Sequence, residues 1–221
     1  MEIEVRDLAG LGEWSAASAL YRSVFGYVEP EFGVSPRLLA ALHENSGSVI
    51  GAFDRGELVG FCYGFTAVED GVIYHYSQAA AVAARAQGAG VGRRLKFAQA
   101  EAARRTGART MRWTFDPYAL RNAHFNFAVL GATAIRFLPD YYDDGSSDRV
   151  LVSWDLSGHV PAPSRSDEVV APSDGRWSAP DPPDRVTLRA ALIERFRAGG
   201  RLVEVTRRGE QAVYKFREAD R

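Results

Sequence analysis

Three glycines within five positions, Gly88, Gly90 and Gly92, form the segment of this sequence best suited to chemistry by residue type and spacing. Glycine lets the backbone turn tightly and approach a ligand without a side chain in the way. A helical pattern follows, and the start of a helix presents N–H groups and a positive dipole end to anions such as pyrophosphate. The turn therefore predicts an anion-binding site. Basic residues lie on both sides of it: Arg85, Arg93, Arg94 and Lys96.

The glycine spacing excludes two common phosphate-binding loops. The turn does not end in Gly-Lys-Ser/Thr, so it is not a Walker A loop. Its glycines also do not follow the Gly-x-Gly-x-x-Gly spacing of a Rossmann fold. Short glycine motifs are weak signals, so a purely structural turn stays open as an alternative. The sequence has no Cys/His cluster with metal-ligand spacing and no serine-nucleophile motif, so we expect no metal.

The elements that must position this turn read as a strand, two helices, three antiparallel strands, a helix, a strand, a helix and two strands. Apolar residues alternate with polar ones in the strands and recur at helical spacing in the helices. A mixed sheet with helices on its faces is the expected packing. The expected helices cover residues 11–25, 36–44, 90–105 and 120–130, and the expected strands 3–7, 48–53, 57–68, 72–84, 109–115, 132–138 and 149–156.

The composition changes after this first part, and we predict a domain at residues 1–157. Residues 158–185 are rich in Pro, Ser and Asp, which indicates a linker or an extended wrapping segment. Residues 186–221 then predict a small extension, a helix followed by a β-hairpin. This extension is too small for an independent core, so it must pack on the first domain or on a second subunit.

The overall composition is ordinary for a soluble protein, with a formal net charge of −1. A charge so close to zero gives no reason to expect nucleic acid or a membrane as partner. The single cysteine, Cys62, lies in an apolar run and predicts a buried thiol in a reducing compartment. The first residues do not resemble a targeting signal, and no apolar run approaches the roughly 20 residues that span a bilayer. We therefore expect a cytoplasmic protein.

The turn resembles the acetyl-CoA signature of the GNAT (Gcn5-related) N-acetyltransferase superfamily, Gln/Arg-x-x-Gly-x-Gly/Ala, which Gln87, Gly90 and Gly92 match. Val82 stands where that family has a valine ahead of the signature, and Leu130-Gly131 resembles the Leu-Gly end of its next helix. The resemblance covers about residues 2–156. It implies an α/β GNAT fold, with a mixed, mostly antiparallel central sheet flanked by helices. It also implies an N-acyltransferase that takes acetyl-CoA or another acyl-CoA as co-substrate.

The resemblance implies which residues hold the coenzyme. Pantetheine would lie against extended backbone at residues 81–83, where a backbone N–H would polarise the thioester carbonyl. Small side chains there leave room for a ligand, although they could equally pack under a helix. The implied coenzyme-binding residues are Ala81, Val82, Ala83, Gln87, Gly88, Ala89, Gly90, Val91, Gly92, Arg93 and Asn122.

Acceptor chemistry requires a base for the amine and an acid for the leaving thiolate. His75 is the first choice of base, because imidazole titrates near neutral pH; a strand histidine without catalytic duty is the alternative. Many family members place a tyrosine acid where this chain has Phe127, so Tyr118, His124 or solvent must take that part. Carboxylates that could bind the acceptor amine are Glu29, Glu31 and Asp116.

A narrower resemblance rests on residues 113–117 and 121–126, with support from 51–54 and 147–149. These segments are similar to a GNAT subgroup associated with acylamino-acid racemase pathways, some members of which are thought to transfer succinyl groups to amino acids. The family also implies a small-molecule amine acceptor and a homodimer. Two rival functions stay open: an acyl-CoA sensor or scaffold without turnover, and acylation of a protein or an antibiotic.

Overall fold

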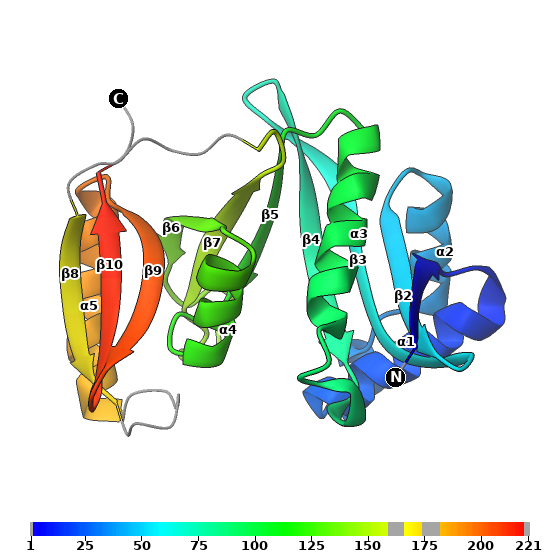
Figure 1. Cartoon of the computed structure of the whole chain (residues 1–221), viewed down its shortest axis with the longest axis horizontal. Coiled ribbons are helices and arrows are strands. Elements are labelled where there is room, and N and C mark those ends of the chain that lie inside the picture. Colours follow the sequence, from blue (N-terminus) through cyan, green and yellow to red (C-terminus); the bar gives the residue numbers. More distant parts are fainter. Residues whose placement is uncertain (1, 159–165, 174–181, 219–221) are drawn as a thin grey trace. The chain divides into compact units, whose positions relative to one another are not determined.

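The computed structural model describes residues 2–158, 166–173 and 182–218 (Figure 1). The chain divides into two compact units, Met1–Met111 and Arg112–Arg221, and each is described by itself. None of the helices in the described part of the chain is both long and apolar enough to cross a membrane.

Unit 1 is built on four antiparallel strands in the order β1-β2-β3-β4. The three expected antiparallel strands are joined by two hairpins, and each turns on two residues with positive φ, Arg55-Gly56 and Asp70-Gly71. Two such residues in succession suit the right-handed twist of paired strands. The strands are β1 (Ile3–Asp7), β2 (Ser48–Asp54), β3 (Glu57–Glu69) and β4 (Val72–Val82).

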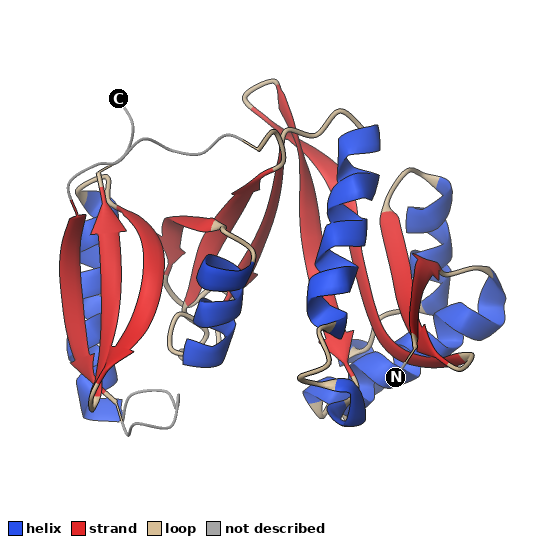
Figure 2. Cartoon of the chain, viewed as in Figure 1, coloured by secondary structure: helices blue, strands red, loops and turns tan. Residues whose placement is uncertain are grey.

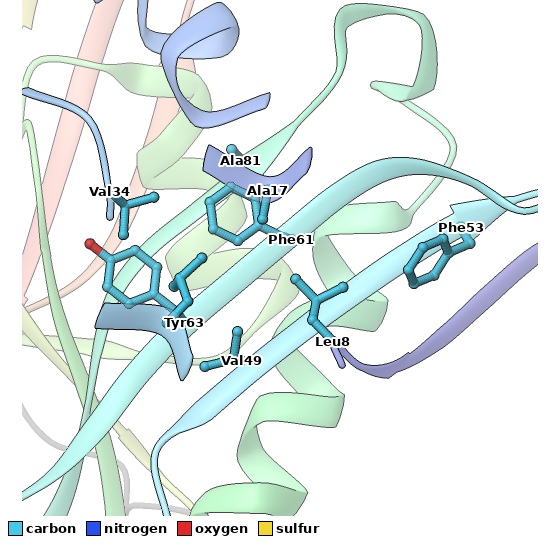
Figure 3. Close-up of a cluster of buried hydrophobic side chains, with 9 residues drawn as sticks. Leu8, Ala17, Val34, Val49, Phe53, Phe61, Tyr63 and Ala81 are labelled. Atoms are coloured by element: carbon cyan, nitrogen blue, oxygen red, sulfur yellow. The ribbon is translucent and has the colours of Figure 1, made fainter. Parts of the chain in front are cut away.

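Alternation along these strands buries two opposite faces of the sheet. On β3, Phe61 joins a core with helices α1 (Gly10–Phe25) and α2 (Pro36–Glu44), shown in Figure 3. Its neighbour Cys62 joins the core under helix α3 (Val91–Arg105) on the other face. Figure 2 shows these helices on either side of the sheet. Cys62 is fully buried, as predicted, and burial raises the pKa of its thiol to about 12.

Unit 2 continues the chain with strands in the order β5-β7-β6-β9-β10-β8. The first strand, β5, spans the division between the units. The predicted helix 120–130 is a short α-helix, α4 (Leu120–His124), which continues into a π-helical turn (Phe125–Val129). Helix α5 (Pro182–Arg197) packs against β6 and β8. The strands are β5 (Thr110–Phe115), β6 (Thr133–Leu138), β7 (Arg149–Asp155), β8 (Ser166–Pro172), β9 (Arg201–Arg208) and β10 (Gln211–Arg217).

The predicted C-terminal extension packs on the strands that precede it. Leu202 of β9 pairs with Ala134 of β6, and Phe196 of α5 lies 6.3 Å from Phe137 of β6, between ring centroids. The extension therefore contacts residues 133–138, which lie within the range 1–157. Residues 112–157 and the extension belong to the same compact unit.

The segment predicted as a linker contains strand β8 and the first residues of α5; the rest of it, residues 159–165 and 174–181, lies outside the described residues. In β8 the buried Val169 and Ala171 alternate with exposed Val170. The composition hid this strand because its partner is distant in sequence: Val170 pairs with Val213 of β10. Pairing of this kind overrides local propensity.

Candidate active site

The predicted anion-binding turn follows directly from the end of β4. Ala83 N donates a hydrogen bond of 2.8 Å to Val59 O, which holds the chain on β3 as it leaves the strand. A single 3-10 turn, Ala84–Ala86, follows, and Ala86 is fully buried. The Gln87 side chain then donates to Val82 O at 3.2 Å. The signature glutamine thus ties the turn back to the end of the strand.

Two glycines give the turn its shape. Gly88 has φ +80° and Gly90 has φ +76°, the left-handed region that other residues rarely adopt. Both are exposed and face open space, since an added Cβ would meet no atom within 4 Å. Gly90 caps helix α3, and Arg94 N donates to Gly90 O at 3.1 Å. The N–H groups of the first helical turn have no intrahelical acceptor, so they are directed at the space beside the glycines. This geometry fits a pyrophosphate.

The basic residues around the turn are not all directed at that space. Lys96 was expected to add charge to it, and this is wrong: its side chain is buried, and Nζ donates to Ser77 Oγ at 2.7 Å. Arg94 donates to Ile3 O at 2.7 Å, and Arg85 forms an ion pair of 2.6 Å with Glu57. Arg93 is exposed, with its guanidinium 4.9 Å from the Phe97 ring centroid. Charge near the turn is therefore supplied mainly by exposed arginines.

Strand β4 carries an irregularity that the sequence did not reveal. Tyr63 pairs with Ala79 and Gly64 with Ser77, so Gln78 is an extra residue on β4, a β-bulge. A bulge bends a strand and redirects its backbone groups, and bulges are frequent beside active sites. Beyond the bulge the strand carries only small side chains up to Val82.

His75, the predicted base, lies in a buried polar network under α3. The network consists of Ser48, His75, Ser77, Lys96 and Gln99. Lys96 donates to Ser77 Oγ, Ser77 Oγ donates to Gln99 Oε1 at 2.7 Å, and Gln99 Nε2 donates to Ser48 Oγ at 2.9 Å. Ser48 Oγ also lies 2.8 Å from His75 Nε2, and the tautomer of the imidazole sets which of the two atoms donates.

The network argues against His75 as a base for a substrate amine. The side chain is 0% exposed, and burial together with the Lys96 charge lowers the pKa of His75 to about 4. Burial also lowers the pKa of Lys96 to about 8. Both shifts follow from the cost of charge away from water. The alternative left open by the sequence, a strand histidine with a structural part, fits this geometry.

The carboxylates predicted to bind the acceptor lie in both units. Glu29 and Glu31 are exposed in the segment between α1 and α2. Asp116, in unit 2, is half-buried and accepts a hydrogen bond of 2.8 Å from Tyr118 N at the end of β5, so it caps this turn. Aromatic side chains close to Glu29 and Glu31 in sequence were not among the predicted site residues, although their spacing is visible: Tyr21, Phe25, Tyr27 and Phe32.

Tyr118, a predicted acid, is hydrogen-bonded to a buried carboxylate in unit 2. Its hydroxyl donates to Asp148 Oδ2 at 2.7 Å, and Arg189 Nε of α5 donates to the same oxygen at 2.8 Å. Asp140 N donates to Oδ1 at 3.0 Å. Burial and the Asp148 carboxylate raise the pKa of Tyr118 far above its ordinary value. A phenol held in this way is poorly suited to deliver a proton.

The other unit 2 candidates lie on helix α4, where Asn122 and His124 are exposed. Phe127, at the position of the family's tyrosine, is buried, with its ring 5.8 Å from that of Phe115. Next to it, the buried Asn126 accepts a hydrogen bond of 3.0 Å from Trp113 Nε1. This position therefore belongs to the core of unit 2.

Comparison with known proteins shows which protein family contains this turn. The model of the acetyltransferase (GNAT) family matches residues 14–127, just over half of the chain, and this stretch includes β4, the glycine turn and α3. The chain belongs to the GNAT acetyltransferase family. A search of curated protein sequences gave no significant match.

Solved structures share the fold of this GNAT chain at low sequence identity. YncA from Salmonella typhimurium, determined with acetyl-CoA, has a TM-score of 0.57 at 18% identity, covering 74% of this chain and 99% of its own. The ribosomal-protein-S18-alanine N-acetyltransferase from Escherichia coli has a TM-score of 0.57 at 16% identity, covering 72% of this chain and 97% of its own. Aminoglycoside 6'-acetyltransferase type Ii has a TM-score of 0.57 at 17% identity, covering 74% of this chain and 100% of its own.

These findings confirm the predicted fold class, a GNAT fold with a mixed, mostly antiparallel sheet flanked by helices. The chain is an N-acetyltransferase, and its co-substrate is an acyl-CoA. The described residues bring together no group of three or more His, Cys, Asp or Glu side chains that could hold a metal ion.

Proposed function

We propose that this GNAT enzyme transfers an acetyl or other short acyl group from coenzyme A to the primary amine of a small molecule, by direct attack of the amine on the thioester. The glycine turn is the observation that carries the proposal. Gly88 and Gly90 have positive φ, and the turn stands at the start of α3. This geometry suits a bound pyrophosphate, which favours a binding site over a purely structural turn.

The coenzyme residues are those named from the sequence. The N–H groups of residues 88–93 bind the pyrophosphate, and Gln87 holds the turn against β4. Pantetheine lies along residues 81–83, where a backbone N–H polarises the thioester carbonyl. Asn122, which the resemblance to the family also assigns to the coenzyme, is exposed on α4.

Proton transfer uses exposed groups in this proposal. The amine loses its proton to water or to an exposed carboxylate, Glu29 or Glu31, in place of the buried His75. Coenzyme A leaves as a thiolate, which His124 or solvent protonates, because the Tyr118 hydroxyl is bound to Asp148. A free thiol has a pKa of about 8.5, so a thiolate is an acceptable leaving group without an enzymic acid.

The finer assignment rests on resemblance. Similarity to the subgroup of acylamino-acid racemase pathways supports an amino acid or related metabolite as acceptor and makes succinyl-CoA an alternative donor. Two of the structural neighbours are named for a ribosomal protein and an aminoglycoside, which keeps protein and antibiotic amines as second candidates. We extend the proposal to a cytoplasmic homodimer, following the habit of the family.

Amine-dependent release of coenzyme A thiol tests the proposal. The purified protein is given acetyl-CoA or succinyl-CoA with a panel of small amines, amino acids, an aminoglycoside and a peptide. Thiol release that rises with one class of amine, with the acylated product detected by mass spectrometry, is the expected result. Release that stays at the rate of thioester hydrolysis for every acceptor contradicts the proposal and favours an acyl-CoA sensor.

A further inference from the structure

Four aromatic side chains gather on the surface of unit 1 where α1 ends. Gly26 caps the helix with φ +71°, and Tyr27 N donates to Arg22 O at 3.1 Å, so the chain folds back on the last helical turn. The ring of Tyr27 then lies 5.6 Å from Tyr21 and 5.9 Å from Phe25, between centroids. The aromatic cluster consists of Tyr21, Phe25, Tyr27 and Phe32.

Most of this cluster faces solvent. Phe25 is 45% exposed, Tyr27 37% and Phe32 60%. Phe32 follows Glu31 in a single 3-10 turn, and its ring lies 5.8 Å from that of Tyr27. Burying these rings would stabilise a complex, whereas in the free protein they leave a large apolar area in water. The cluster is therefore available to a ligand.

The cluster is continuous with the strand that carries the coenzyme site. The Tyr21 ring lies 6.3 Å from Phe61 of β3, and Phe61 is stacked on Tyr63 at 6.2 Å with 4° between the ring planes. Phe61 pairs with Ala81 of β4, and Tyr63 with Ala79. Figure 3 shows Phe61 and Tyr63 in one cluster with Ala81. A row of rings thus leads from the surface to the small residues of β4.

The charged residues of the segment that carries Tyr27 and Phe32 have one sign. Segment 26–35 contains Glu29 and Glu31, both exposed, and no basic residue; the nearest ones in sequence are Arg22 and Arg37, in the flanking helices. Carboxylates beside electron-rich aromatic faces favour a cation, and they disfavour a ligand that carries its own carboxylate.

We infer that the aromatic cluster with Glu29 and Glu31 binds the acceptor, and that the acceptor is an aromatic primary amine without a carboxylate, of the arylalkylamine class. This inference rests on the proposed transfer to the primary amine of a small molecule, and within that class it selects an amine without a carboxylate over an amino acid. The ring of the acceptor packs on Phe25, Tyr27 and Phe32, and the glutamates attract its ammonium group before deprotonation. The occupant is a small cation, since the exposed carboxylates of the same segment would be costly to cover with another protein.

The test compares acceptors that share an ethylamine unit. Thiol release from acetyl-CoA by the full-length protein is measured with 2-phenylethylamine, with ethanolamine and with phenylalanine. We expect kcat/KM for 2-phenylethylamine to exceed both others by about tenfold or more, mainly through KM, since a contact with an aromatic face changes affinity by a few-fold to about thirtyfold. Glu31→Gln lowers the preference for 2-phenylethylamine over phenylalanine.

Phe25→Ala and Phe32→Ala identify the surface. Each raises KM for 2-phenylethylamine several-fold, and raises it by a larger factor than KM for ethanolamine, which has no ring to lose a contact. Leu11→Ala is the matched control, because Leu11 is an apolar side chain of the same helix, 67% exposed and at its other end. Phe32 lies outside α1, so Phe32→Ala keeps the test valid if Phe25→Ala destabilises the helix.

The outcomes separate this inference from the proposed function. Thiol release with equal kcat/KM for 2-phenylethylamine and ethanolamine overturns the inference and leaves the proposed function standing. If none of the acceptors stimulates thiol release, both the inference and the proposed function are contradicted. A dimer by light scattering that Phe32→Ala converts to monomers also overturns the inference, because the cluster is then an interface between two copies of this chain.

Discussion

Helix α3 takes part in two regions of opposite character. At its N-terminus, the glycine turn of residues 87–92 is exposed and shaped by backbone dihedral angles. On its inner face, Lys96 and Gln99 belong to the buried polar network with Ser48, His75 and Ser77. In the proposed function the first region binds the coenzyme through N–H groups, whereas the second holds α3 on the sheet through side-chain hydrogen bonds. The side chains with the most reactive chemistry, a histidine and a lysine, therefore serve stability.

The pH dependence of unfolding gives the largest expected effect of the network. The pKa of His75 falls from 6.5 to about 4 on folding, so the unfolded chain binds more protons between these values. Stability is then fully present above pH 6.5 and decreases as the pH falls toward 4, by about 3 kcal/mol at most. Urea unfolding at a series of pH values measures this loss. In His75→Leu the slope between pH 5 and 6.5 decreases; an unchanged slope would assign the titration to another group.

Gln99→Leu separates the two regions by mutation. Gln99 joins Ser48 to Ser77, so leucine leaves two buried hydroxyls without their partner. We expect a loss of about 2 to 3 kcal/mol in the free energy of unfolding, with an unchanged affinity for acetyl-CoA. Gln211→Leu is the control, since Gln211 is exposed on β10. A normal stability with weakened coenzyme binding would show that the network is part of the site.

Tyr118→Phe asks whether unit 2 contains a comparable structural network. The substitution removes one of three hydrogen bonds to Asp148 and keeps the ring, so we expect a loss of about 1 kcal/mol in stability. The matched control is Tyr142→Phe, because the Tyr142 ring is 56% exposed. If Tyr118 were the acid, thiol release would fall by orders of magnitude at unchanged stability, and this result would contradict the structural assignment.

The parts of the fold that local pattern determines could be predicted from the sequence. The hairpins at Arg55-Gly56 and Asp70-Gly71 and the helix start at Pro36 follow from residues with specific backbone preferences. Strand β8 could not be predicted, because its pairing with β10 joins residues about 40 positions apart, such as Val170 and Val213. The bulge at Gln78 is likewise a property of the pairing between strands.

The candidate site also has parts that local sequence determines and parts that depend on contacts between distant segments. The glycine turn was predictable because positive φ is a local demand that glycine meets. The environment of His75 was not, since Ser48 and Gln99 come from distant segments and only the folded sheet brings them to its ring. Gly51, part of the subgroup resemblance, also has a structural reason: an added Cβ would lie 2.3 Å from Leu8 Cδ2. A motif residue can thus reflect packing as well as chemistry.

The most direct test of the account is a calorimetric titration of acetyl-CoA into Gly90→Glu and Gly107→Glu. Both glycines have positive φ, +76° and +83°, and open space around them, but they lie at opposite ends of α3. The two variants therefore share the same backbone strain. We expect Gly107→Glu to bind like the native protein and Gly90→Glu to lose more than about hundredfold in affinity, because a carboxylate 4 Å from a phosphate charge costs about 4 kcal/mol at an effective dielectric of 20. Equal affinity in the two variants would contradict the assignment of the turn as the coenzyme site.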